Sequence, residues 1–167
     1  FTSVKAGLRA VVSGSNLDTG PLQKPEGFFL MPVDCPLVPP EVIRQIAEKH
    51  REDAEAFIVP CFRGKKGHPL FIPAQYAEEI LTYEGEGGLK AVTSRNEHRL
   101  IRLETGCEAV VLDMDTPEGY QEVLEYYERP VFAGDDSPVF SEELKGKRLF
   151  LIRHGEIRQH EEKIFLG

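Results

Sequence analysis

The sequence has no excess of basic residues, no closely paired cysteines and no long apolar run. Its 20 Lys and Arg residues against 28 Asp and Glu residues give a formal net charge of −8. This balance argues against a surface for nucleic-acid phosphates, because such surfaces need clustered Lys and Arg to displace counterions. The apolar runs are too short for a membrane-spanning helix, and the first residues do not resemble a signal peptide. We therefore expect no nucleic-acid partner and no membrane partner.

The cysteines are Cys35, Cys61 and Cys107, an odd number without a C-x-x-C pair. They favour free thiols in a reducing cytoplasm over a disulfide framework or a zinc site. The length of 167 residues and the 41% hydrophobic content suit one globular domain, or one domain with a fragment of another. Because the chain begins at Phe1 without a methionine and stops at Gly167 just after a predicted strand and turn, we expect both of its ends to be cut.

Helix and strand signals alternate along the chain. Continuous apolar runs bounded by turn residues predict strands at 28–33, 56–60, 68–72, 99–103 and 109–112. Apolar residues at spacings of three and four predict helices at 3–12, 41–50, 73–81, 89–94 and 116–128. This alternation predicts parallel pairing and a layered α/β sheet.

Two of the predicted helices carry signals for their ends and inner faces. Ser3 is the expected N-cap of the first, and its expected inner face consists of Val4, Leu8, Val11 and Val12. Thr116 is the expected N-cap of the last, with Pro117 at its first position. Its expected inner face consists of Tyr120, Val123, Leu124 and Tyr127.

Acidic residues follow two of the predicted strands. The stretch FFLMPVDCPLVPPEV places Asp34 after an apolar run, and VVLDMDTPEG places Asp113 and Asp115 after another. Ligands of open α/β sheets bind outside the carboxyl ends of the strands, and carboxylates gathered there repel unless a cation joins them. Mg²⁺ holding a polyphosphate suits such a position. Alternatively, Asp34 caps a turn and Asp115 helps to cap a helix without any metal, and spacing alone does not decide.

Five segments, in this order, carry a family resemblance: SVKAGL, FFLMPVDCPLVPPEVI, GKKGHPLFI, EGEGGLKAV and VVLDMDTPEGY. Together they resemble the MobA-like or MocA-like NTP transferases of molybdenum-cofactor biosynthesis. The likeness covers residues 1–129 and includes the family's Asp-x-Pro, Gly-His-Pro and Asp-Thr-Pro motifs, here at 34–36, 67–69 and 115–117. It implies a Rossmann-like fold of the GT-A type with a mostly parallel sheet.

The resemblance also implies roles for individual residues. Asp34 and Asp115 would bind the Mg²⁺ that bridges the triphosphate of CTP or GTP, with Asp113 beside them. A phosphorylated acceptor such as molybdopterin, a small pterin-like compound, would attack the α-phosphate, and pyrophosphate would leave. His68 would line the acceptor pocket, although a lone His is otherwise a structural donor or a surface residue.

Two further segments match anionic ligands less specifically. Ser3, Lys5 and Gly7 correspond to the start of a helix near the nucleotide, where backbone amides suit phosphate, with simple helix capping as the alternative. The basic residues at 63–66 could steer an anionic ligand, but we favour a solvated loop.

The ends of the chain depart from a complete transferase domain. The family's glycine-rich nucleotide loop, with its basic residue, would precede Phe1, so we expect a domain that is incomplete at its N-terminus. If the chain is complete as written, NTP binding should be weakened or lost. Residues 130–147, rich in Pro, Gly and Asp, read as a linker.

The C-terminal stretch LFLIRHGEIRQ resembles the opening of the histidine phosphatase superfamily. The resemblance implies that His154 takes up a phosphoryl group and that Arg153 clamps it. Residues 148–167 would then hold the first strand of a second, truncated domain.

Three functions therefore stay open at the level of sequence. The first is a Mg²⁺-dependent nucleotidyltransferase portion, and the second is a histidine phosphatase for a small phosphate ester in a bifunctional parent protein. The third is an inert truncated binding module. An exposed sheet edge could also pair with a second copy and give a homodimer.

Overall fold

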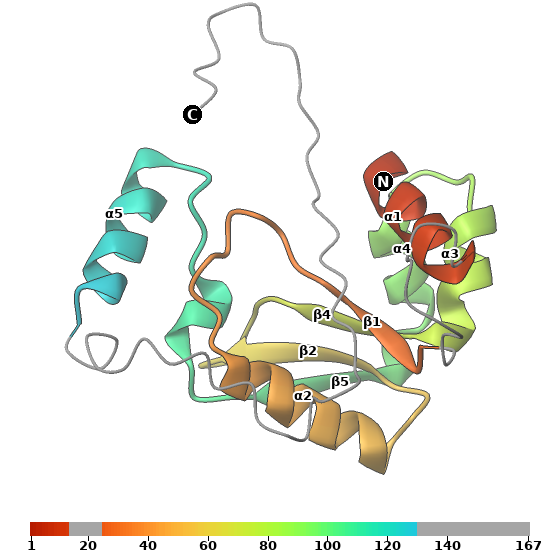
Figure 1. The fold of residues 1–167 in the computed structure, drawn as a ribbon, viewed down its shortest axis with the longest axis horizontal. Helices are drawn as coiled ribbons and strands as arrows, with labels where there is room; N and C mark the ends of the chain where they lie inside the picture. Colours follow the sequence, from red (N-terminus) through yellow and green to blue (C-terminus); the bar gives the residue numbers. More distant parts are fainter. Residues whose placement is uncertain (14–24, 130–167) are drawn as a thin grey trace, which may run out of the picture.

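The computed structural model describes residues 1–13 and 25–129, in which helices and strands alternate along the chain (Figure 1). The helices are α1 (Thr2–Ser13), α2 (Pro40–Glu52), α3 (Ala77–Thr82), α4 (Gly88–Arg95) and α5 (Pro117–Tyr127). The strands are β1 (Gly27–Leu30), β2 (Phe57–Phe62), β3 (Lys65–Lys66), β4 (Leu70–Pro73) and β5 (Leu100–Glu104). Short 3-10 helices lie at η1 (Ala74–Tyr76), η2 (Glu97–Arg99) and η3 (Glu108–Val111).

The sheet is mixed, which corrects the prediction of a mostly parallel sheet while the α/β class is confirmed. Its order is β1-β4-β2-β3, with β5 pairing β2. Only the β2–β5 pairing among the described strands is parallel. One cause is the two-residue turn between β2 and β3, where Arg63 and Gly64 have φ of 50° and 79°. Positive φ at both positions is typical of a tight hairpin turn, so the chain reverses direction here.

The alternation of helices and strands correctly predicted that β1 and β2 run in the same direction, but it did not predict which strands are adjacent in the sheet. Strands β1 and β2 both run antiparallel to β4, so they run in the same direction, as a strand-helix-strand unit requires. Strand β4, however, lies between them. The sequence rule could not foresee this insertion, because it depends on the hairpin that follows β2.

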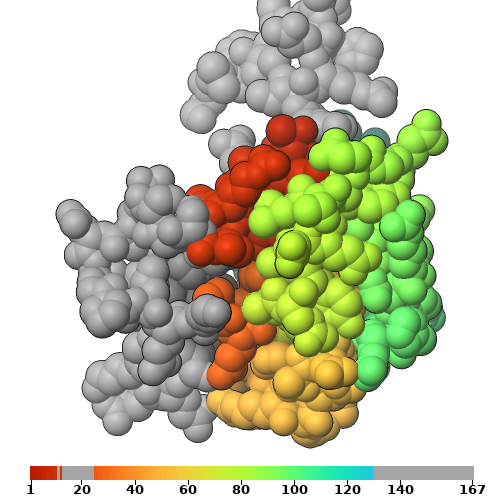
Figure 2. All heavy atoms as spheres, turned by 90° about the vertical axis from the view of Figure 1, so that its right-hand side faces the viewer, coloured from red at the N-terminus to blue at the C-terminus, as the bar shows by residue number. Residues whose placement is uncertain are grey.

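Both faces of the sheet are covered, and successive residues of one strand enter different layers. Phe57 packs with Val4, Leu8 and Val92 on the face covered by α1, α3 and α4. The next residue, Ile58, packs with residues of α2 on the other face. Figure 2 shows α1 lying against the yellow-green α3 region, with α2 at the opposite end of the view. This alternation follows from the two-residue period of a strand.

The first helix differs from its prediction at both ends. Ser3 lies inside α1 rather than at its N-cap, because the helix begins at Thr2. Val4 and Leu8 are buried as expected, but Val12 is 55% exposed. The helix therefore rests on the sheet by its first two turns.

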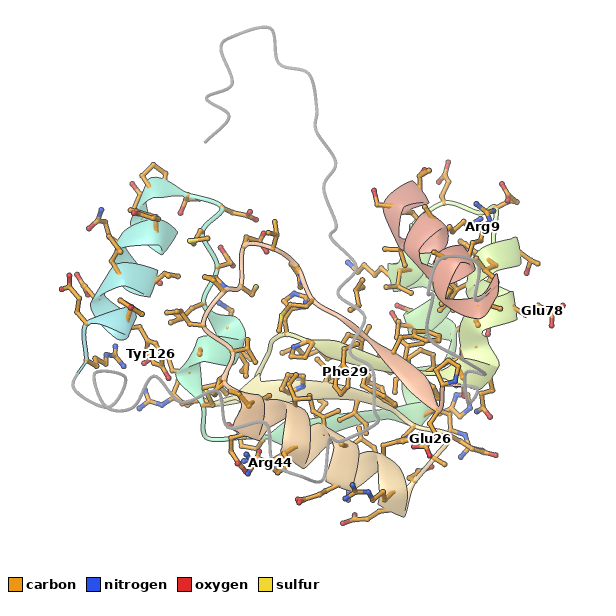
Figure 3. The ribbon with its side chains drawn as sticks, in the orientation of Figure 1. Arg9, Glu26, Phe29, Arg44, Glu78 and Tyr126 are labelled. Carbon is orange, nitrogen blue, oxygen red and sulfur yellow. The ribbon has the colours of Figure 1, made fainter. Side chains whose placement is uncertain are left out.

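The last helix has the predicted cap but a shifted inner face. The Gly119 amide donates to Thr116 Oγ1 over 3.0 Å, which confirms the N-cap. Val123 and Tyr126 are buried, whereas the predicted inward residues Tyr120 and Tyr127 are exposed. In Figure 3, Tyr126 lies on the side of α5 that faces η3, and it packs with Ala109 and Leu112. The support is thus a short 3-10 segment rather than the sheet.

The predicted strand at 109–112 is wrong, because residues 108–111 form η3. Ala109 and Val110 are fully buried. Burial explains why this run is apolar, as it would in a buried strand. A run of four apolar residues does not distinguish a strand from another buried segment. The predicted linker at 130–147 and the predicted strand after it lie outside the described residues.

Among residues 1–13 and 25–129, none of the helices has the length and apolar content needed to cross a bilayer. That agrees with the short apolar runs of the sequence.

Replacing Ile46 with Ala should lower the free energy of unfolding by about 3 kcal/mol, as large-to-small changes in a packed core do. Ile46 has no exposed surface and lies between α2 and the sheet. Urea unfolding measures the change. The control is Val33→Ala, because Val33 is 57% exposed and its truncation should leave the stability nearly unchanged. Equal losses in the two variants would contradict the packing of α2 on the sheet.

Candidate functional site

Asp34 lies in a turn that follows β1 and precedes α2. The strand ends at Leu30, three residues earlier than the predicted end, and the Cys35 amide donates to the Pro32 carbonyl over 3.4 Å. Prolines at 39 and 40 then start α2. Asp34 is half-buried, while the neighbouring Cys35 is only 4% exposed. The turn is therefore anchored by the buried Cys35, while the Asp34 carboxylate stays accessible.

Asp113 and Asp115 lie between η3 and α5, and a backbone hydrogen bond joins this loop to the Asp34 turn. The Met114 amide donates to the Asp34 carbonyl over 3.0 Å. Within the loop, the Asp115 amide donates to Asp113 Oδ1 over 3.4 Å. Both acids are exposed. The prediction that they follow a strand is wrong, but the prediction that they meet Asp34 agrees with this contact.

The electrostatics of Asp115 indicate that its side chain meets that of Asp34. A hydrogen bond with Asp34 raises the pKa of Asp115, and the negative charge of Asp34 raises it further. Burial and the charge of Asp113 make smaller contributions in the same direction. Two carboxylates this close share a proton or repel each other, and a cation would relieve the repulsion.

The charges of two of these acids reach the His68 side chain. Burial lowers the pKa of His68, and the charges of Asp34 and Asp113 oppose that change. Its backbone amide donates to the Val110 carbonyl over 2.7 Å. Its buried Nδ1 has no hydrogen-bond partner among the described residues. The Nδ1 of His68 is therefore available to a ligand, as far as the described residues show.

The carboxylates of Asp34 and Asp115 form a pair that suits a hard divalent cation. Among the described residues, no group of three or more His, Cys, Asp or Glu side chains is placed to hold a metal ion. Mg²⁺ uses one or two protein carboxylates and takes its remaining ligands from water and phosphate. Asp34 and Asp115 fit that requirement, since each of their side chains lies within hydrogen-bond reach of the other.

The residues predicted to lie near the nucleotide on the first helix are not brought together with these acids. Ser3, Lys5 and Gly7 belong to α1, which lies beside α3 and α4, on the side away from α5 (Figure 1). Lys5 is 8% exposed, and its Nζ donates to the Tyr83 carbonyl over 2.5 Å and to Glu84 Oε1 over 3.2 Å. These contacts hold α1 to the segment after α3.

The basic residues of the β2–β3 hairpin have local partners. Lys66 pairs with Glu97 over 3.4 Å, and the backbone amides of Arg63 and Gly64 donate to Glu104. This agrees with the interpretation as a solvated loop. Arg153 and His154 lie outside the described residues.

Two glycines shape the backbone of the site in a way that the sequence did not predict. A Cβ on Gly67 would lie 2.0 Å from the Val110 carbonyl oxygen, and one on Gly119 would lie 2.5 Å from the Asp113 carbonyl oxygen. Both glycines thus permit close packing of the acidic loop. The glycines next to His68 and after Asp115 were the available signal, but a glycine does not reveal which backbone lies opposite.

The profile of the family described as "MobA-like NTP transferase domain" matches residues 1–100. Two solved structures of Rv0371c from Mycobacterium tuberculosis H37Rv also resemble the chain. One, a complex with manganese, is 27% identical with a TM-score of 0.52, and covers 71% of this chain and 59% of its own. The other is 26% identical with a TM-score of 0.54, and covers 75% and 61%.

A homologue of Rv0371c from Mycobacterium sp. strain JC1 shares the fold, at 20% identity and a TM-score of 0.54, covering 71% of this chain and 56% of its own. The chain thus spans less than two thirds of the length of these structures. No curated protein sequence matches it. The prediction of a histidine phosphatase finds no support in these comparisons.

Replacing Asp34 with Asn should lower the pKa of Asp115 toward its ordinary value, since the two largest causes of the elevation come from Asp34. A ¹³C NMR titration of the Asp115 carboxyl carbon measures it. Asp113→Asn is the matched control and should shift this pKa less, because the charge of Asp113 is the smallest of the causes. An unchanged Asp115 pKa in Asp34→Asn would mean that the two side chains do not meet.

Proposed function

Because the chain belongs to the MobA-like NTP transferase family, we propose that it is part of a nucleotidyltransferase whose divalent cation is bound by Asp34 and Asp115. The donor is CTP or GTP, and the acceptor is a small phosphorylated compound of the molybdopterin kind. The donor and the acceptor are proposed from the sequence resemblance. The cation is proposed from the carboxylates themselves.

The observation that carries the proposal is the contact between Asp34 and Asp115, which come from distant parts of the chain. Their proximity raises the pKa of Asp115, so the apo site has an unfavourable concentration of negative charge. Structural caps would not require two carboxylates from separate loops to approach each other. A divalent cation with phosphate oxygens as its other ligands explains the arrangement.

The chain's own residues have distinct tasks in this proposal. Asp34 and Asp115 hold the cation, and the amide of Met114 keeps their loops together. When bound, the cation neutralises charge on the phosphates of the nucleotide. The buried Nδ1 of His68 has no hydrogen-bond partner in the described part of the chain, so it can hydrogen-bond to an acceptor phosphate or to a hydroxyl. Positioning and electrostatic stabilisation would supply most of the rate, as in other phosphoryl-group transfers.

The identity of the cation follows from the ligand chemistry. Carboxylate oxygens suit both Mg²⁺ and Mn²⁺. The manganese complex of Rv0371c supports a divalent cation in a protein of similar fold, and Mg²⁺ is our proposal for the working ion.

The chain spans less than two thirds of the similar structures, so we propose the whole activity for the complete protein rather than for this chain by itself. An inert module that keeps only cation or acceptor binding is the alternative for the chain by itself. A cytoplasmic location and a homodimer also stay proposals. The motif Arg153-His154-Gly155 supports a phosphatase only at the level of sequence.

Asp34→Ala should abolish the binding of Mn²⁺, because it removes half of the carboxylate pair. Electron paramagnetic resonance of free Mn²⁺ measures the affinity of the chain. Asp53→Ala makes the same chemical change at the C-terminal end of α2, a helix about 20 Å long at 1.5 Å per residue that begins after the Asp34 turn. It should leave Mn²⁺ binding unchanged.

Release of pyrophosphate from CTP or GTP should likewise require Asp34. Where the chain binds Mn²⁺ but releases no pyrophosphate, the module alternative holds for this chain. Equal Mn²⁺ affinity in Asp34→Ala and in the unchanged protein would contradict the proposed site.

A further inference from the structure

The segment that carries His68 lies directly against the backbone of η3. The Gly67 amide donates to the Pro60 carbonyl at 2.8 Å, and the His68 amide donates to the Val110 carbonyl at 2.7 Å. A Cβ on Gly67 would lie 2.0 Å from the Val110 carbonyl oxygen and 2.5 Å from its carbonyl carbon. Backbone atoms cannot move aside as the end of a flexible side chain can. Only glycine therefore permits this approach.

The same stretch of backbone continues into the acidic loop. Val110 has no exposed surface, and Leu112 is 9% exposed, so both are held in the interior. Asp113 follows directly, and the next amide, that of Met114, donates to the Asp34 carbonyl. Contacts from Gly67 to Asp34 thus run through the consecutive residues 110–114.

The His68 side chain depends on this packing. Its Nδ1 makes no hydrogen bond to the described residues, so that nitrogen does not hold the ring in place. Its main chain is held on both sides, by the Gly67 amide before it and by the fully buried Pro69 after it. The position of the imidazole follows from where the loop meets Val110.

We infer that Gly67 and Val110 are positioning residues, whose backbone contact fixes where the His68 imidazole lies. What His68 then binds rests on the proposed function. The backbone contact between Gly67 and Val110 does not depend on the proposed function. Residues that support a metal site without binding the metal typically change affinity or activity by about 10-fold to 100-fold when altered.

The first test uses the protein without metal or nucleotide. Val110→Ala removes the Cγ2 methyl that lies 2.9 Å from the position of a Gly67 Cβ, and should loosen the contact without a clash. The ¹⁵N and ¹³C resonances of the His68 ring should broaden or shift. Val92→Ala is the matched control, because Val92 is equally buried but packs on the other face of the sheet with α1 and α3. It should leave the His68 ring signals unchanged.

The second test is a double-mutant cycle on pyrophosphate release. As a single substitution, Val110→Ala should reduce the rate of pyrophosphate release by about tenfold. It should add less than about twofold in a His68→Ala background, because residues that act through one another are not additive. Gly67→Ala should behave in the same way, and Val110→Ala carries the test if that variant does not fold.

The outcomes separate this inference from the proposed function. His68 ring signals that respond equally to Val110→Ala and Val92→Ala, or additive losses in the cycle, would overturn the positioning role. A protein that neither binds Mn²⁺ nor releases pyrophosphate contradicts the proposed function. In that event the ring signals alone still decide whether Gly67 and Val110 position His68.

Discussion

The arrangement of the site depends on one backbone hydrogen bond, from the Met114 amide to the Asp34 carbonyl. It joins a turn that follows the first described strand to a loop that precedes the last described helix. The contact brings like charges together, which costs free energy in the absence of a counterion. Under the proposed function, this hydrogen bond would hold the acids together before a cation binds. Preorganisation of this kind spares the bound state the cost of ordering two loops.

Much of the layered fold could be predicted from periodicity. The apolar run around Phe28 and the stripe containing Val42 and Ile46 lie where the sequence indicates. Apart from the strand predicted at 109–112, which is a 3-10 helix, the errors concern what lies next to an element rather than the element itself. The insertion of β4 between β1 and β2 depends on a turn at Arg63 and Gly64 whose geometry is not evident from polarity. The inner face of α5 was misjudged because η3, rather than a strand, supports it.

The candidate site shows the same division. Asp34 and Asp115 were identified by their motifs, and their side chains meet. Lys5 was also assigned by resemblance, but it is committed to the Tyr83 carbonyl and Glu84. A carboxylate in an exposed loop remains accessible to a ligand. A Lys on the buried side of a helix instead forms hydrogen bonds within the protein. Val110 could not be predicted at all, because its carbonyl carries the contact and its side chain gives no sign of it.

The place of β4 in the sheet has a consequence for the order of folding. The hairpin from β2 through β3 to β4 closes a short loop, while β1 must wait for a more distant partner in β4. Because closing short loops costs less chain entropy, contacts of low sequence separation generally form early. Our hypothesis is that the acidic pair, which needs both β1 and the segment before α5, assembles after the hairpin. Pulse-labelled hydrogen exchange that protects the Met114 amide before those of β2 would refute it.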